Sequence, residues 1–177
     1  MKRILAFGAS SSRKSINKRL ASYAASLMEG AEVDLLDLND FEMPIYSIDR
    51  EQDDGIPKLA VRFKEHVQKA DAIIISFAEH NGTYTAAFKN ILDWATRVEK
   101  NMWQDKPMLL LSTSPGGRGG QRILEIAVSS YAYLNGKVIG SLSVPSFNDN
   151  FSGDKLVHED LDAQLKSLIL QLVDATH

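Results

Sequence analysis

Apolar and polar positions divide the chain into alternating strand-like and helix-like segments. Nearly continuous apolar runs predict four buried strands, at Ile4–Phe7, Ala72–Phe77, Met108–Ser112 and Lys137–Val144. A fifth run, Val33–Leu38, alternates more between apolar and polar residues, so we expect it at an edge of the sheet. Unbroken apolar strands are typical of a parallel sheet that is covered by helices on both faces.

The segments between these runs repeat apolar residues at helical spacing. The predicted helices are Ser15–Met28, Pro57–Lys69, Thr85–Val98, Gly120–Leu134 and Leu161–Val173. Strict alternation of strands and helices predicts an α/β fold, a three-layer sandwich with one five-stranded parallel sheet. Five strands favour the flavodoxin-like order 2-1-3-4-5, in a single domain over residues 1–177. The longest irregular segment, Asn39–Ile56, is expected to be a lid or an interface segment.

Composition narrows the classes of function. The net charge of −3 lacks the basic excess of a nucleic-acid-binding protein. The absence of cysteine excludes a disulfide scaffold, a thiol nucleophile and a cysteine-ligated metal site. No stretch approaches the ~20 apolar residues of a membrane span, and the N-terminal apolar run is too short for a signal peptide, so we expect a cytoplasmic protein. Isolated histidines and a group of acidic residues are expected at the surface without a metal; they are His66, His158, His177, Glu51, Asp53 and Asp54.

Candidate chemistry lies in loops that follow the first, third and fourth strands. Ligands of open α/β sheets bind outside the carboxyl ends of the strands, where these loops meet. In the first loop, residues 8–17, serine hydroxyls precede a helix whose amides and dipole favour an anion, and Arg13 and Lys14 add positive charge. A phosphate group is the expected ligand of this loop, although neither the P-loop nor the GxGxxG pattern is present. The alternative is a plain serine-rich turn in which Ser15 only caps the helix.

The second loop, Ala78–Thr83, contains the turn signal Asn81-Gly82. Gly82 permits close approach of a ligand to the backbone, so a planar heterocycle could pair with exposed amides there. In the alternative, Thr83 caps the next helix and Glu79 is only solvated.

The third loop, Ser112–Gly120, has four glycines in five positions. A backbone without side chains can lie flat beside a large planar ligand. The alternative is a flexible loop that holds no ligand.

Together the three loops resemble the NAD(P)H-dependent FMN reductases, a flavodoxin-like family that includes azo-dye, quinone and chromate reductases. The matching residues in the first loop and its helix are Ser10, Ser15, Asn17, Leu20 and Ala21. Those of the second loop and its helix are Glu79, Asn81, Gly82, Lys89, Asn90, Asp93 and Trp94. Those of the third are Ser112, Ser114, Pro115, Gly116, Gly119 and Gly120. The chain departs from the family pattern in placing Arg13 one position late, and in having Ala78, His80 and Thr83 for proline, tyrosine and serine.

The resemblance implies that FMN is the bound cofactor. Its phosphate would be held by Ser10, Arg13, Ser15, Ile16 and Asn17. The pyrimidine edge of the flavin ring would meet backbone groups of Glu79, His80, Asn81, Gly82 and Thr83. The other side of the ring would be flanked by Ser114, Pro115, Gly116 and Gly117. The His80 side chain would either touch the ring edge or lie at the surface.

The resemblance also implies an activity. NADPH or NADH would give a hydride to the flavin, and electrons would pass to a quinone, an azo compound, a metal oxyanion, free flavin or oxygen. No catalytic protein residue is predicted. Arg118 would either meet a phosphate of the nicotinamide cofactor or be solvated. The resemblance implies a homodimer or homotetramer, and we expect no nucleic-acid or membrane partner. The helix that bears Phe88, Ile91, Leu92 and Trp94 is a candidate contact with a partner chain.

Two other functions remain open from the sequence. A flavodoxin-type electron carrier would bind FMN without reacting with NAD(P)H, although such carriers are usually more acidic than this chain. A binding protein of the same fold would hold no flavin.

Overall fold

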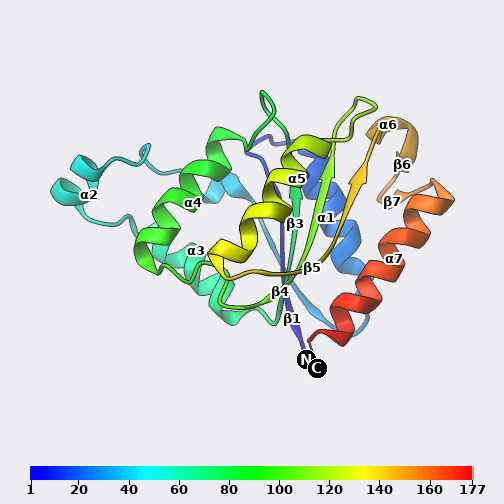
Figure 1. The fold of residues 1–177 in the computed structure, drawn as a ribbon, viewed down its shortest axis with the longest axis horizontal. Coiled ribbons are helices and arrows are strands. Elements are labelled where there is room, and N and C mark those ends of the chain that lie inside the picture. Colours follow the sequence, from blue (N-terminus) through cyan, green and yellow to red (C-terminus); the bar gives the residue numbers. More distant parts are fainter. Residues whose placement is uncertain (177) are drawn as a thin grey trace.

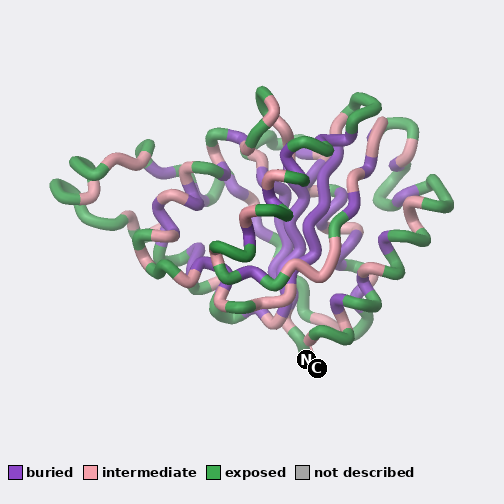
Figure 2. Tube along the Cα trace, in the orientation of Figure 1, coloured by how far each residue is buried: buried purple, intermediate pink, exposed green. Residues whose placement is uncertain are grey.

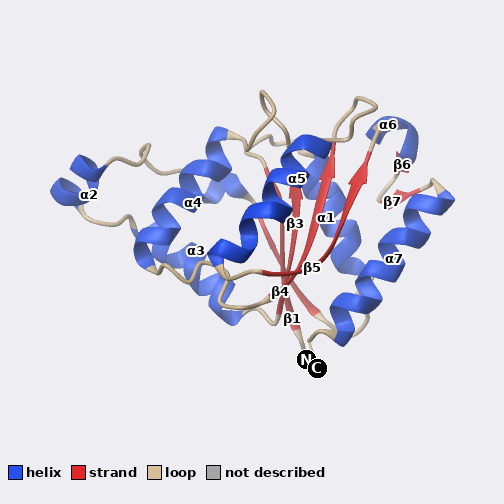
Figure 3. Cartoon of the chain, viewed as in Figure 1, coloured by secondary structure: helices blue, strands red, loops and turns tan. Residues whose placement is uncertain are grey.

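The computed structural model describes residues 1–176, and its centre is a five-stranded parallel sheet between two layers of helices (Figures 1 and 3). The strands are β1 (Arg3–Ala9), β2 (Glu32–Leu36), β3 (Ala72–Phe77), β4 (Pro107–Thr113) and β5 (Lys137–Val144). Their order is β2-β1-β3-β4-β5, and every neighbouring pair is parallel. The flavodoxin-like order and the edge position of the second strand are therefore confirmed.

The main helices lie where the apolar spacing predicts them. They are α1 (Ile16–Ser26), α3 (Lys58–Lys69), α4 (Ala86–Val98), α5 (Gln121–Ser130) and α7 (Glu159–Asp174). The fourth predicted helix, Gly120–Leu134, is α-helical only as far as Ser130, because Tyr131–Leu134 forms the 3-10 turn η2. Asn135 then takes the left-handed conformation at φ 58°, which terminates the turn.

The continuous apolar runs arise because both faces of the sheet are covered. In β1, Leu5 and Phe7 pack in a core with α3, α4 and α5, whereas Ile4 and Ala6 pack on the opposite face with α1 and α7. Figure 2 shows the buried strands at the centre, with exposed segments around them.

A projecting arm, residues 43–57, connects the region after β2 to α3 (Figure 1). It lies in the segment predicted to be irregular, but that segment contains the 3-10 turn η1 (Leu38–Phe41) and the short helix α2 (Ile48–Asp54). Asn90 and Trp94 of α4 hold its base: the Asn90 Oδ1 accepts from the Tyr46 amide at 2.9 Å, and the Trp94 Nε1 donates to the Pro44 carbonyl at 2.7 Å. The two motif residues therefore position the arm.

Four apolar residues of α4 are buried within the chain itself: Phe88, Ile91, Leu92 and Trp94. These side chains are covered by the chain's own core, and a contact of this helix with a partner chain stays a prediction. Its outer face instead carries the Lys89–Asp93 ion pair and Arg97, which contacts Glu51 of the arm at 2.9 Å.

After β5 the chain forms a small cap that the sequence did not reveal. It consists of α6 (Phe147–Asn150) and an antiparallel hairpin of β6 (Phe151–Ser152) and β7 (Lys155–Leu156). The rings of Phe147 and Phe151 stack at 4.6 Å, and the Arg19 guanidinium of α1 lies over both. The cap is thereby fixed to the outer side of α1.

Two histidines have specific local roles. The His66 Nδ1 lies 2.7 Å from the Asp34 carboxylate and its ring is partly buried, so its prediction as a surface residue is wrong. His158 caps α7 and is exposed as expected, whereas His177 lies outside the described residues.

None of the helices in residues 1–176 combines the length and the apolar character needed to cross a membrane.

Candidate functional site

The loops after β1, β3 and β4 line one cavity of about 310 Å³ at the carboxyl edge of the sheet. We call it the three-loop cavity. Its lining residues are Ser10, Ser12, Lys14, Ser15, Ile16, Asn17, Ala78, Glu79, His80, Thr113, Ser114 and Pro115. The three segments singled out in the sequence therefore meet at one place, as the topology of a parallel sheet requires.

The first loop presents hydroxyl and amide groups at the start of α1. The Ser10 Oγ accepts from the Ser12 amide, and the Ser15 Oγ accepts from the Lys18 amide, both at 3.1 Å. The amides of Ile16 and Asn17 precede the first intrahelical hydrogen bond and are not used by the Ser15 cap. Serine hydroxyls, these two amides and the positive end of the helix dipole form a donor set that suits a phosphate.

Asn17 fixes the start of α1 to the sheet. Its side chain is buried; the Oδ1 accepts from the Ser76 Oγ at 2.7 Å and from the Thr113 amide at 3.1 Å. The Nδ2 donates to the Thr113 carbonyl at 3.2 Å. The side chain is thus engaged by β3 and β4, and only the backbone amide of Asn17 is available to a ligand.

The second loop is a tight hairpin turn. His80 and Thr83 exchange two backbone hydrogen bonds of 3.1 Å, while Asn81 and Gly82 have φ values of 52° and 75°. Two successive positive φ angles are typical of a type I′ turn, which Asn-Gly favours. The exposed His80 ring lines the three-loop cavity, which supports contact with a ligand rather than a purely surface role.

The polar residues that flank this turn act as helix caps. The Glu79 Oε2 accepts from the Ile123 amide in the first turn of α5 at 3.1 Å, so Glu79 is not merely solvated. Thr85, not Thr83, caps α4: its Oγ1 accepts from the Phe88 amide and donates to the Ala9 carbonyl. The loop is therefore attached to α5 and to the end of β1.

The third loop is anchored at Gly119. The Gly119 carbonyl accepts from the Ser112 Oγ at 2.7 Å and from the Ser143 Oγ at 3.0 Å. A Cβ at Gly119 would lie 2.4 Å from the Ser143 Oγ, so the backbone approaches β5 more closely than a side chain permits. These contacts attach the end of the third loop to β4 and β5.

Several predicted residues lie outside the three-loop cavity. Gly82 and Gly117 line a larger neighbouring cavity of about 1040 Å³. Among the described residues, Asn81, Thr83 and Gly116 line neither of these two cavities. Sequence reasoning did not single out Ser12, Ala78 and Thr113 as lining residues, and it gave Lys14 only as a source of positive charge. Thr113 could have been found from its position, because it follows the predicted strand Met108–Ser112 and lies at the carboxyl edge of the sheet, where ligands bind.

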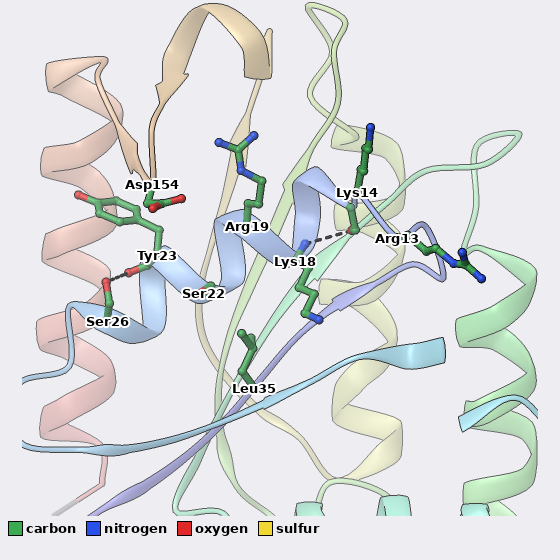
Figure 4. Close-up of a pocket in the computed structure, with 10 residues that line it drawn as sticks. Arg13, Lys14, Lys18, Arg19, Ser22, Tyr23, Ser26, Leu35 and Asp154 are labelled. Atoms are coloured by element: carbon green, nitrogen blue, oxygen red, sulfur yellow. Dashed lines mark hydrogen bonds between the residues drawn. The ribbon is translucent and has the colours of Figure 1, made fainter. Parts of the chain in front are cut away.

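Arg13 lines a groove of about 590 Å³ along the outer side of α1, not the three-loop cavity (Figure 4). Two other cations of this groove have partners: the Arg19 guanidinium lies over the Phe147 and Phe151 rings, and Lys18 is ion-paired. Lys18 pairs with Asp37 at 2.7 Å, and this hydrogen bond lowers the pKa of Asp37 to about 2. Burial, with a hydrogen bond to Asp162, raises the pKa of Tyr23 to about 12, so Tyr23 stays neutral at physiological pH.

The donor set of the three-loop cavity fits FMN. Hydroxyls and free amides of the first loop suit a phosphate, and Glu79, His80, Ser114 and Pro115 line the same cavity, where they would flank a planar ring. Residues 1–176 contain no group of three or more histidine, cysteine or acidic side chains that could hold a metal ion.

Comparison with known proteins agrees with this fit. The model of the NADPH-dependent FMN reductase family matches residues 2–149. The chain is 29% identical to a probable NADPH:quinone oxidoreductase 2 of Oryza sativa subsp. japonica over 179 aligned positions, which cover 96% of this chain and 86% of the relative. It is 36% identical to a 2-hydroxy-1,4-benzoquinone reductase of a Burkholderia species, over 60% of this chain and 57% of the relative.

Solved structures share the fold over nearly the whole chain. A flavoenzyme NAD(P)H:(acceptor) oxidoreductase from Paracoccus denitrificans superposes with a TM-score of 0.83 at 25% identity, covering 99% of this chain and 97% of that chain. The family match spans all three loops and the sheet that brings them together. The chain therefore belongs to the NADPH-dependent FMN reductase family and is an NAD(P)H-dependent flavin oxidoreductase.

Proposed function

We propose that this protein is an NAD(P)H:quinone oxidoreductase that holds FMN in the three-loop cavity. The observation that carries the proposal is that three loops line one cavity, which brings the phosphate donors of the first loop together with residues of the second and third loops. When bound, FMN would supply the redox chemistry by taking a hydride equivalent from NAD(P)H and passing two electrons to the acceptor.

The protein's own groups would bind and orient the cofactor. The Ile16 and Asn17 amides, with the hydroxyls of Ser10 and Ser15, would hold the phosphate. Backbone groups of residues 79–83 would meet the pyrimidine edge of the ring, and residues 114–117 would lie on its other side. Hydrogen bonds from a rigid backbone can orient a ring without a protein nucleophile, so we assign no catalytic side chain.

Quinones are the acceptors that the relatives favour. The rice and Burkholderia relatives are described as quinone reductases, and the rice relative aligns over 96% of this chain. The alternative acceptors of the same reduced cofactor are an azo compound, a metal oxyanion and free flavin, and a direct comparison of turnover rates would rank them.

We also propose that residues 1–177 act as one FMN-binding domain in a cytoplasmic homo-oligomer. The projecting arm supports an oligomer, because it exposes the apolar side chains of Ile45 and Ile48. Ile45 has 75% of its surface exposed. Exposed apolar side chains on a protruding segment are typical of an interface. Light scattering of the wild type and of an Ile45→Glu, Ile48→Glu double variant tests this: a monomeric wild type contradicts it.

One experiment tests the proposed activity. The purified protein is loaded with FMN, mixed with NADPH without oxygen, and then given a benzoquinone. We expect the yellow absorbance to bleach and to return with stoichiometric loss of the quinone. Persistence of the yellow colour with both NADPH and NADH would favour an electron carrier, and failure to take up FMN would favour a flavin-free binding protein.

A further inference from the structure

The cavity beside the flavin site is a wide groove with two arginines, which we call the arginine groove. Its lining residues are Glu79, Gly82, Gly117, Arg118, Gln121, Arg122, Glu125, Ser143, Pro145 and Leu161, and its volume is about 1040 Å³. Glu79 lines both cavities, and the third loop separates them, with Pro115 on one side and Gly117 on the other. A ligand in the arginine groove would therefore lie next to the proposed flavin ring.

Both guanidinium groups are available to a ligand. Arg118 and Arg122 are exposed, and within residues 1–176 the structure records no hydrogen bond or ion pair for either side chain. The two carboxylates of the groove are used elsewhere: the Glu79 Oε2 accepts from the Ile123 amide, and the Glu125 Oε1 accepts from the Gln121 Nε2 at 3.0 Å. The formal charges of the two arginines and the two glutamates balance, but within residues 1–176 neither guanidinium is ion-paired to a carboxylate, so both remain free to meet an anionic ligand.

The position of Arg122 depends on the second loop. A Cβ placed on Gly82 would lie 3.0 Å from the Arg122 Nη1 and 3.1 Å from its Cζ, so the guanidinium rests against the bare backbone of the turn. Gly82 also needs its φ of 75° for the turn itself. The same glycine therefore shapes the proposed pyrimidine-edge loop and makes room for a cation beside it.

We propose that Arg118 and Arg122 bind the 2′-phosphate of NADPH, and that the arginine groove makes NADPH the preferred electron donor. This inference rests on the proposed function, because the donor must reach a flavin in the three-loop cavity. A phosphate monoester carries a charge of about −1.5 to −2 at pH 7, which two guanidinium groups can match. Guanidinium also offers paired donors in the geometry that phosphate oxygens accept. NADH lacks this phosphate and would leave both guanidinium groups unpaired.

The kinetic test compares the two donors in Arg118→Ala and Arg122→Ala, with Arg62→Ala on the outer side of α3 as the matched control. We expect the ratio of kcat/KM for NADPH to that for NADH to fall about tenfold in each groove variant, mainly through the KM for NADPH. Arg118→Lys and Arg122→Lys should retain part of the ratio. An unchanged ratio, or equal losses with NADPH and NADH, would overturn the assignment to the 2′-phosphate.

A binding test avoids dependence on turnover. Calorimetry of the purified wild-type protein should show that adenosine 2′,5′-bisphosphate binds more tightly than adenosine 5′-monophosphate. The difference should shrink about tenfold in the alanine variants of Arg118 and Arg122. Equal affinity of the wild type for the two nucleotides would contradict the proposal. An FMN titration of the same variants separates the two claims, because loss of the flavin site would appear in that titration and loss of the groove would not.

Discussion

The carboxylate of Glu79, at the end of β3, accepts a hydrogen bond of 3.1 Å from the backbone amide of Ile123, in the first turn of α5. This contact joins the second loop of the site to the helix that follows the third loop. It satisfies an amide that the helix itself leaves unpaired, and the negative charge lies at the positive end of the helix dipole. The spacing between the two loops therefore depends partly on one side chain.

The first prediction removes this cap. Glu79→Ala should lower the free energy of unfolding by about 1 kcal/mol and weaken FMN binding, because the two loops lose their direct connection. Glu79→Gln keeps a carbonyl oxygen as acceptor and should retain most of both properties. Urea unfolding of the apoprotein and fluorescence titration with FMN measure the two effects. Equal behaviour of the alanine and glutamine variants would show that the cap is unimportant.

The second prediction concerns the anchor of the third loop. Gly119→Ala should destabilise the protein by about 1–3 kcal/mol, because its Cβ would lie 2.4 Å from the Ser143 Oγ and its φ is 58°. Gly117→Ala is the matched control, since a Cβ there has no atom within 4 Å and should change stability by less than about 0.5 kcal/mol. Thermal unfolding of both variants measures the difference. Similar melting temperatures would contradict the tight packing at Gly119.

The third prediction concerns the hold of α4 on the projecting arm. The Asn90 Nδ2 donates to the Met43 and Pro44 carbonyls at 3.1 Å, in addition to its bond from the Tyr46 amide. Asn90→Ala should therefore speed hydrogen exchange in residues 43–57. Lys89→Ala removes only an exposed pair with Asp93 and should leave that exchange nearly unchanged. Hydrogen-exchange mass spectrometry should show less protection of the arm in Asn90→Ala than in Lys89→Ala. Identical exchange in the two variants would contradict the proposed role of Asn90 in holding the arm.

The fourth prediction concerns acid stability. The hydrogen bond from Lys18 and the amide of Asn39 lower the pKa of Asp37 from 3.8 to about 2 in the folded state. A lowered folded-state pKa stabilises the protein above pH 3.8, and this contribution is lost as the pH falls from about 4 toward 2. Because each side chain of the pair is a third exposed, we expect only about 1 kcal/mol.

Asp37→Asn keeps an oxygen that can accept from the Asn39 amide but removes the charge. The difference in unfolding free energy between the wild type and this variant should have its full size at pH 7, fall as the pH drops below about 4, and be mostly lost by pH 2. Asp40→Asn, on the same turn and without a recorded side-chain partner in residues 1–176, is the control. A difference that stays constant from pH 7 to pH 2 would rule out the ion pair as its source.

The sequence predicted the sheet, and the convergence of the three loops at one edge of it, because both follow from short local patterns of apolar and polar residues. Continuous apolar runs at Ala72–Phe77 and Lys137–Val144 gave the bounds of β3 and β5 as the structure has them. The turn at Asn81-Gly82 also follows from local chemistry, since two positive φ angles suit this pair.

Long-range partners could not be predicted in this way. The bond from Ile123 to Glu79 joins residues far apart in the sequence, as do the contacts of Asn17 with Ser76 and Thr113. The sequence also could not show in which direction a side chain points. Arg13 follows the serines of the first loop, but it lines the groove outside α1. Amphipathic spacing identified the apolar face of α4 but not whether its own core or a partner would cover it.

The claim that the start of α1 binds a flavin phosphate is tested most directly by comparing FMN with riboflavin, which lacks the phosphate. Ser15→Asp keeps a good helix cap and places a negative charge where the phosphate would lie. We expect the wild-type apoprotein to bind FMN at least about tenfold more tightly than riboflavin, and the variant to lose this preference while its melting temperature changes little. Equal affinity of the wild type for FMN and riboflavin, or an unchanged preference in Ser15→Asp, would contradict the account.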